Sequence, residues 1–213
     1  MRGLCVTVVI TAIASHGLAG PVLNTPETWD SGLAGWTNTT GNAALSNPSN
    51  YLRITFSSQG GAPTFEEDTI STSGIDFTGN YQTNPTLALR FSFYAEDVLP
   101  LSSVLYLHSA VSTSRWEYVF ANTVVGSWTT HTMEFIYGPG WSGPGGAAEF
   151  QSDLANIDWI GINIARKLDT IQQVYGIDDW EYFLIPEPGT VCVLASAFLS
   201  LAFTFRKRLR IRQ

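Results

Sequence analysis

Apolar residues alternate with polar ones in several runs along the middle of the chain. In the first run, Leu52, Ile54 and Phe56 are separated by the more polar Arg53 and Thr55. A period of two puts successive side chains on opposite faces, which is typical of a strand with one buried face. The same alternation recurs in the runs 87–94, 104–110, 116–121, 128–137, 157–165 and 175–184.

The last run, 175–184, mixes acidic and aromatic residues. Strict alternation predicts that Ile177, Asp179 and Glu181 share one face of this strand. Asp178, Trp180 and Tyr182 would then lie on the opposite face. An apolar isoleucine would then lie on the same side as two carboxylates.

The segments between the runs are rich in Gly, Asn, Ser and Pro, as turns require. Residues 138–146 are expected to form a long irregular loop, and the acidic stretch 66–68 a solvated turn. Only residues 150–156 indicate a helical turn. Eight or nine strands without βαβ spacing predict an all-β fold, an antiparallel jelly-roll β-sandwich.

The first nineteen residues have the features of a secretory signal peptide. Arg2 supplies the positive charge, an apolar stretch of about a dozen residues follows, and small residues stand at Gly17 and Ala19. We expect cleavage after Ala19. The alternative is a buried strand or helix that opens the fold, because Val6, Val8 and Ile10 stand at alternate positions.

The C-terminal segment has three ordered parts. Pro186, Glu187 and Pro188 precede sixteen uncharged residues, 190–205, and a basic tail, 206–213. A helix over the apolar part would measure about 25 Å, near the lower limit for a membrane span. The basic tail would stay in the cytoplasm, with the rest of the chain outside. A plain tail anchor would have the same hydropathy.

The order Pro-Glu-Pro, span and Arg-rich end resembles the PEP-CTERM sorting signal of exopolysaccharide-producing Gram-negative bacteria. Ile185 stands where that family usually has Val, a small departure. The resemblance implies export through the translocon, transient anchoring in the inner membrane and processing by an exosortase at or near the motif. It therefore predicts three parts: a signal peptide (1–19), a β-sandwich ectodomain (20–184) and a sorting signal (185–213, with the motif at 185–189).

Composition and charge exclude some classes of function for the ectodomain. The chain is 45% hydrophobic and 14% charged, which suits a packed core. Residues 21–185 hold five basic and seventeen acidic side chains, so we expect no nucleic-acid partner. The two cysteines, Cys5 and Cys192, lie in the two terminal segments. No disulfide is therefore expected in the ectodomain.

Two short stretches, 29–36 and 175–181, resemble the opening and closing segments of non-catalytic jelly-roll domains, including carbohydrate-binding modules. In such modules the two segments lie side by side and often hold a structural Ca²⁺, which prefers carboxylate and carbonyl oxygens. The resemblance makes Glu27, Asp30, Asp178 and Asp179 the candidate calcium ligands. The alternative is that one adjacent aspartate belongs to a turn and the other is solvated.

Aromatic side chains are the candidate sugar-binding groups, because the C–H face of a pyranose stacks on an aromatic ring. Trp141 lies in the Gly/Pro-rich loop, where we expect it to be exposed; Tyr94, Trp116 and Tyr118 are further candidates on strands. The alternative is that these rings belong to the core.

Catalytic signatures are absent from the sequence. The closest approach to the Glu-x-Asp-x-x-Glu motif of jelly-roll glucanases has Gly176 in place of the first Glu. His108 and His131 lack metal-ligand spacing, and no Gly-x-Ser-x-Gly elbow occurs. We therefore expect a non-enzymatic cell-surface protein that binds exopolysaccharide or another carbohydrate. The alternatives are a structural biofilm-matrix protein without a discrete ligand and a hydrolase of unrecognised type.

Overall fold

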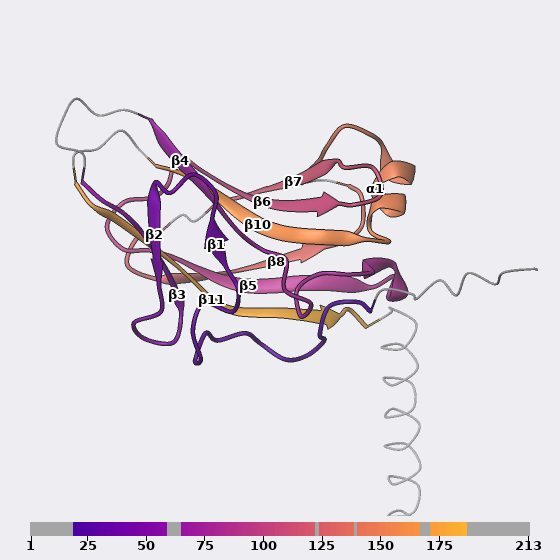
Figure 1. Ribbon diagram of the computed structural model, residues 1–213, viewed down its shortest axis with the longest axis horizontal. Coiled ribbons are helices and arrows are strands. Elements are labelled where there is room, and N and C mark those ends of the chain that lie inside the picture. Colours follow the sequence, from indigo (N-terminus) through magenta and orange to yellow (C-terminus); the bar gives the residue numbers. More distant parts are fainter. Residues whose placement is uncertain (1–18, 59–64, 122–123, 139, 167–170, 187–213) are drawn as a thin grey trace, which may run out of the picture.

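The computed structural model describes residues 19–58, 65–121, 124–138, 140–166 and 171–186 (Figure 1). The predicted membrane span and basic tail, Glu187 and Pro188 lie outside these residues, as does all but the last residue of the predicted signal peptide. Within the described ranges, no helix is both long and apolar enough to cross a membrane.

The described residues form two antiparallel β-sheets packed face to face (Figure 1). The six-stranded sheet has, in spatial order, β1 (Thr37–Asn38), β4 (Glu66–Thr72), β10 (Ile157–Arg166), β6 (Ser102–Ser109), β7 (Arg115–Phe120) and β9 (Trp141–Ser142).

The second sheet has five strands, including the longest strand among the described residues, β11 (Gln173–Leu184). Its spatial order is β2 (Ala43–Ser46), β3 (Leu52–Phe56), β11, β5 (Leu87–Ala95) and β8 (Trp128–Glu134). The helical elements of the described part are short: the 3₁₀ turn η1 (Tyr81–Thr83) and the helix α1 (Ala147–Asp153). The prediction of an all-β antiparallel sandwich is confirmed.

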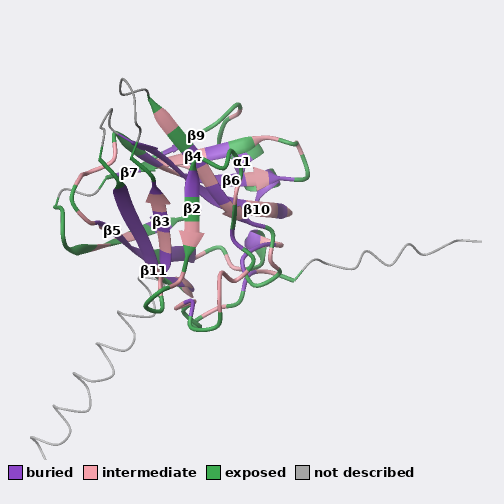
Figure 2. Cartoon of the chain, turned by 60° about the vertical axis from the view of Figure 1, so that its left-hand side comes forward, coloured by how far each residue is buried: buried purple, intermediate pink, exposed green. Residues whose placement is uncertain are grey.

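The core lies between the sheets, where the inward positions of the alternating runs meet. Leu52, Ile54 and Phe56 of β3 are fully buried, as the alternation predicts, and Arg53 and Thr55 between them are half-buried. The isoleucines of β10 at 160, 162 and 164 face them from the six-stranded sheet and are also fully buried. Figure 2 shows the same division, with buried strand positions inside and exposed loops at the rim.

The predicted alternation of the last strand is wrong at one point. β11 contains a bulge between Asp178 and Glu181, and Asp179 there has a left-handed backbone with φ of 51°. The extra residue shifts the alternation by one position. Ile177 and Trp180 consequently both point into the core, while Asp179 is exposed.

The acidic stretch 66–68 is also not a solvated turn, because it begins strand β4. Asp68 is 1% exposed and its carboxylate accepts hydrogen bonds from the backbone N–H groups of Thr39, Thr40 and Ala43, at 3.2, 3.0 and 2.9 Å. These donors lie in the connection from the end of β1 to the start of β2, and the Thr39 N–H also donates to the Thr69 carbonyl oxygen at 2.9 Å. The carboxylate therefore fixes that connection to the edge of the six-stranded sheet.

Candidate functional site

The seven tryptophans differ in burial, and the difference divides them into core and surface residues. Five of the seven tryptophans are 0–6% exposed and belong to the core. Trp159 on β10 is half-buried and Trp128 on β8 is 43% exposed. These two lie on the outer faces of different sheets, so each face of the sandwich presents one tryptophan to solvent.

The prediction that Trp141 is exposed is wrong. Trp141 is 6% exposed, its Nε1 donates to the carbonyl oxygen of Glu134 at 2.8 Å, and its ring lies 5.1 Å from that of Phe150. The loop around it folds back as strand β9, which pairs with β7 and closes one end of the sandwich. Tyr118 is half-buried because it packs edge-on against Trp141 at 5.2 Å.

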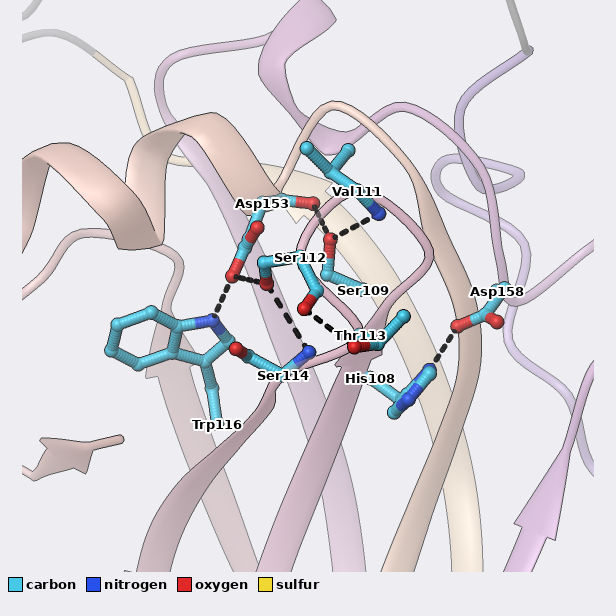
Figure 3. A network of polar contacts seen from close by, with 9 residues as sticks. All are labelled: His108, Ser109, Val111, Ser112, Thr113, Ser114, Trp116, Asp153 and Asp158. Carbon is cyan, nitrogen blue, oxygen red and sulfur yellow. Dashed lines mark hydrogen bonds and ion pairs between the residues drawn. The ribbon is translucent and has the colours of Figure 1, made fainter. Parts of the chain in front are cut away.

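Trp116 is likewise a core residue rather than a sugar platform. It is fully buried, and its Nε1 donates to the Asp153 carboxylate at 2.7 Å (Figure 3). Asp153 ends α1 and also accepts from the Ser112 hydroxyl at 2.7 Å, so the network ties the helix to the β6–β7 hairpin. Of the four predicted sugar-binding residues, only Tyr94 remains on an open sheet face, where its ring lies 5.2 Å from that of Trp128.

A cavity of about 510 Å³ lies on the outer face of the six-stranded sheet. We call it the β4–β10 cavity. Its walls combine one indole, one guanidinium and a series of hydroxyl groups. The lining residues are Gly35, Thr37, Thr39, Thr69, Ser71, Thr72, Ser73, Arg115 and Trp159.

Trp159 owes its outward position to the alternation of β10, whose isoleucines take the inward positions. Its ring stacks on the His108 ring of the neighbouring strand β6, with centroids 5.3 Å apart and planes 9° from parallel. His108 is in turn held by Asp158, whose Oδ1 lies 2.6 Å from its Nδ1 (Figure 3). The indole therefore has a fixed orientation on the sheet.

Arg115 is also fixed in place, although its side chain is 49% exposed. Its guanidinium lies 4.1 Å from the centroid of the Tyr106 ring and 3.1 Å from the Glu117 carboxylate. Burial raises the pKa of Tyr106, the Arg115 charge opposes this rise, and Glu117 adds to it. Tyr106 is thus a neutral platform beneath the guanidinium at physiological pH.

A glycine lies in the sheet between Ser71, which lines the cavity, and Tyr106, which lies beneath Arg115. Gly161 of β10 pairs with Ser71 on one side and Tyr106 on the other. A Cβ atom at this position would lie 2.6 Å from the Ile70 carbonyl oxygen and 2.8 Å from the Ser71 Cβ. The backbones of β4 and β10 approach too closely for any larger residue.

The candidate calcium ligands lie at the opposite sheet. Glu27 and Trp180 exchange backbone hydrogen bonds of 2.8 and 3.2 Å, so the opening segment does lie beside the last strand. Burial raises the pKa of Asp178; the charges of Asp179 and Asp30 raise it further, and a hydrogen bond from the Asp179 N–H opposes them. Within the described residues, however, no three His, Cys, Asp or Glu side chains form a group that could hold a metal ion. Calcium binding stays a prediction.

The outward position of Trp159 can be inferred from the sequence, although Trp159 was not among the predicted sugar-binding residues. With Ile160, Ile162 and Ile164 assigned to the core, alternation places Trp159 on the solvent side of the same strand. Nothing local to Arg115 or His108 shows that they join it, because they come from strands brought together only by the sheet order β10-β6-β7.

No protein-family model matches the sequence, and no curated protein matches it. Solved structures match its fold. The agarase AgWH50C has a TM-score of 0.57 at 12% identity, over 79% of this chain and 26% of its own. An exo-β-agarase has 0.55 at 10% identity, over 79% and 26%, and PfGH50B has 0.53 at 13%, over 72% and 23%.

This chain therefore spans about a quarter of the length of each of those proteins. At such low identity the similarity shows the fold alone, a two-sheet antiparallel β-sandwich. A family 11 carbohydrate-binding module of Clostridium thermocellum is also similar, over 76% of this chain and 94% of its own at 12% identity. Its TM-score of 0.48 is too low to carry an argument.

Proposed function

We propose that this protein is a non-catalytic, carbohydrate-binding β-sandwich that holds a polysaccharide in the β4–β10 cavity. One observation carries the proposal: the half-buried Trp159, stacked on His108, lines the same cavity as Arg115 and several Thr and Ser hydroxyls. A sugar ring has an apolar C–H face and a rim of hydroxyl groups. An indole beside hydroxyls and a planar guanidinium complements both parts.

The fixed geometry favours binding, because little conformational entropy is lost when the side chains are already in position. Trp159 is held by His108 and Asp158, and Arg115 by Tyr106 and Glu117. The fold is also one that two agarases contain in about a quarter of their length. This supports polysaccharide as the ligand class to test first.

The lining of the cavity supports the non-catalytic part of the proposal. Glycoside hydrolysis ordinarily needs two carboxyl groups on either side of the scissile bond. The β4–β10 cavity is lined by hydroxyls, one guanidinium, one indole and a glycine, and none of its lining residues is acidic. The groups present suit recognition of a sugar rather than its cleavage.

The same proposal includes a place for the protein. The N-terminal nineteen residues would direct export, and an exosortase would process the chain near Pro186, Glu187 and Pro188, leaving the sandwich at the cell surface or in the extracellular matrix. Its ligand there would be an exopolysaccharide. This part rests on the sequence resemblance, and mass spectrometry of the mature C-terminus in an exosortase-containing host tests it: a C-terminus still ending at Gln213 would refute processing.

Affinity electrophoresis tests the binding site. The full chain would migrate in native polyacrylamide gels that contain low-melting agarose, mixed-linkage β-glucan or xylan. Truncation of a central aromatic anchor costs about 2 kcal/mol, or about thirtyfold in affinity. We expect Trp159→Ala to weaken binding at this site by that factor and so to reduce retardation. Ile75→Ala changes an apolar residue that is 85% exposed in a loop and should behave as wild type. Unchanged retardation of Trp159→Ala would refute the site.

A further inference from the structure

The outer face of the five-stranded sheet carries its own aromatic cluster. Trp128 begins β8 and pairs across the strands with Tyr94 of β5. Its ring lies 5.2 Å from that of Tyr94 at a 35° tilt, and 5.5 Å from that of Tyr51 in an edge-on arrangement. We call these three residues the Trp128 cluster. The two tyrosines fix the orientation of an indole that is 43% exposed.

A glycine beneath the cluster shows how closely the rings approach the sheet. Gly176 of β11 pairs with Tyr94 and is buried by the rings above it. A Cβ atom there would lie 2.9 Å from Trp128 Cη2 and 3.0 Å from Tyr51 Cδ2. The backbone of β11 is thus the floor on which the two rings rest, and the cluster is a rigid platform.

A polar cavity of about 430 Å³ lies next to this platform on the same face. The pair Ser92–Thr130, which lines it, lies two residues along the strands from the pair Tyr94–Trp128. At about 3.4 Å per residue, this places the start of the cavity about 7 Å from the platform. The cavity is lined by Pro26, Arg90, Ser92, Thr130, Asp179 and Glu181.

The polar groups in this cavity suit hydroxyls better than charges. The Arg90 guanidinium forms an ion pair with Glu181, so its charge is already compensated. Asp179, turned outward by the β11 bulge, accepts a 3.4 Å hydrogen bond from the Ser92 hydroxyl, which also lies 3.4 Å from the Thr130 hydroxyl. Two carboxylates against one guanidinium leave the cavity with a net negative charge, which disfavours anionic ligands.

We propose that the Trp128 cluster and the adjoining polar cavity form a second saccharide site, specific for an uncharged sugar. The inference rests on the proposed function, because it supposes that the β4–β10 cavity is the first site. The two sites lie on opposite outer faces of the sandwich, so they bind two different glycan strands. The protein then cross-links polysaccharide, rather than gaining avidity along one strand.

The test compares five versions of the full chain in the same gels and by light scattering with soluble mixed-linkage β-glucan and agarose. These are wild type, Trp128→Ala, Trp159→Ala, the double variant and the Ile75→Ala control. We expect each single variant to keep partial retardation and the double variant to keep none. Wild type and Ile75→Ala should raise the scattering of the polysaccharide solution, whereas either single variant should not.

A second variant distinguishes loss of the second site from misfolding of Trp128→Ala. Thr130→Arg places a long side chain in the polar cavity from an exposed strand position and leaves the Trp128 cluster intact. We expect it to match Trp128→Ala in retardation and scattering, with circular dichroism unchanged from wild type.

The outcomes separate the two proposals. If Trp128→Ala and Thr130→Arg both behave like Ile75→Ala, the second site is refuted and the first stands. If Trp159→Ala changes nothing but Trp128→Ala abolishes binding, the proposed function of the β4–β10 cavity is refuted, and cross-linking with it. If no probe retards any version, both proposals are overturned.

Discussion

Replacing Asp153 by alanine tests how the helix α1 is held to the β6–β7 hairpin. Asp153 is 1% exposed at the end of α1. Its Oδ2 accepts hydrogen bonds from Trp116 Nε1 and from the Ser112 hydroxyl, both at 2.7 Å (Figure 3). The substitution removes the acceptor of the buried Trp116 Nε1–H and of the half-buried Ser112 hydroxyl.

The expected cost follows from these two bonds. A hydrogen bond to a charged group contributes about 1.5–3 kcal/mol, so two would give about 3–6 kcal/mol. The other carboxylate oxygen, Oδ1, is buried without a hydrogen-bond partner among the described residues, and its uncompensated desolvation reduces the net contribution. We therefore expect Asp153→Ala to lower the free energy of unfolding by about 3 kcal/mol, a large part of the 5–15 kcal/mol typical of a domain.

Urea unfolding followed by tryptophan fluorescence measures this loss, and Asp158→Ala is the matched control. Asp158 lies five positions away, but its side chain is 41% exposed and it pairs with His108 at the surface. Such a pair contributes less than about 1 kcal/mol. Equal losses for the two variants, or a loss below about 1 kcal/mol for Asp153→Ala, would refute the reasoning.

Three further predictions concern other parts of the fold. Asp68→Ala should lower the free energy of unfolding by about 2–4 kcal/mol in chemical denaturation, because the backbone N–H groups of Thr40 and Ala43 lose their carboxylate acceptor. The exposed neighbour is the control: Glu67→Ala should change it by less than about 0.5 kcal/mol. Burial lowers the pKa of His131, so the unfolded state binds its proton more readily. Stability should therefore fall as the pH drops below about 6.5, and His131→Phe should weaken this dependence; an unchanged pH profile would contradict it. Gly161→Val should prevent close pairing of β4 with β10 and abolish both cooperative unfolding and polysaccharide retardation. A variant with wild-type melting would show that the two strands have room for a side chain at this position.

The sequence predicted the sandwich well where burial follows simple alternation. Leu52, Ile54 and Phe56, and the isoleucines of β10, occupy the core positions assigned to them. It failed at the β11 bulge, because one inserted residue with a positive φ at Asp179 moves Trp180 to the other face. A bulge depends on pairing with β5, and alternation within a single strand contains no information about that partner.

The candidate site was less predictable than the fold. Trp141 looked exposed because glycines and prolines surround it, but the loop folds back so that the indole packs on Phe150 and bonds to Glu134. The outward position of Trp159 could be predicted from the alternation in β10. Its partners His108 and Arg115 were not, since β6 and β7 meet β10 only through the order of strands in the sheet.

Oxidative footprinting of the tryptophans, read by mass spectrometry with and without bound polysaccharide, tests the central claim most directly. In the free protein, Trp128 and Trp159 should be oxidised readily and the five core tryptophans slowly, as their burial dictates. On addition of a polysaccharide that retards the protein, oxidation of Trp159 should fall severalfold. Undiminished oxidation of Trp159 in the bound protein would contradict a sugar site on the six-stranded sheet.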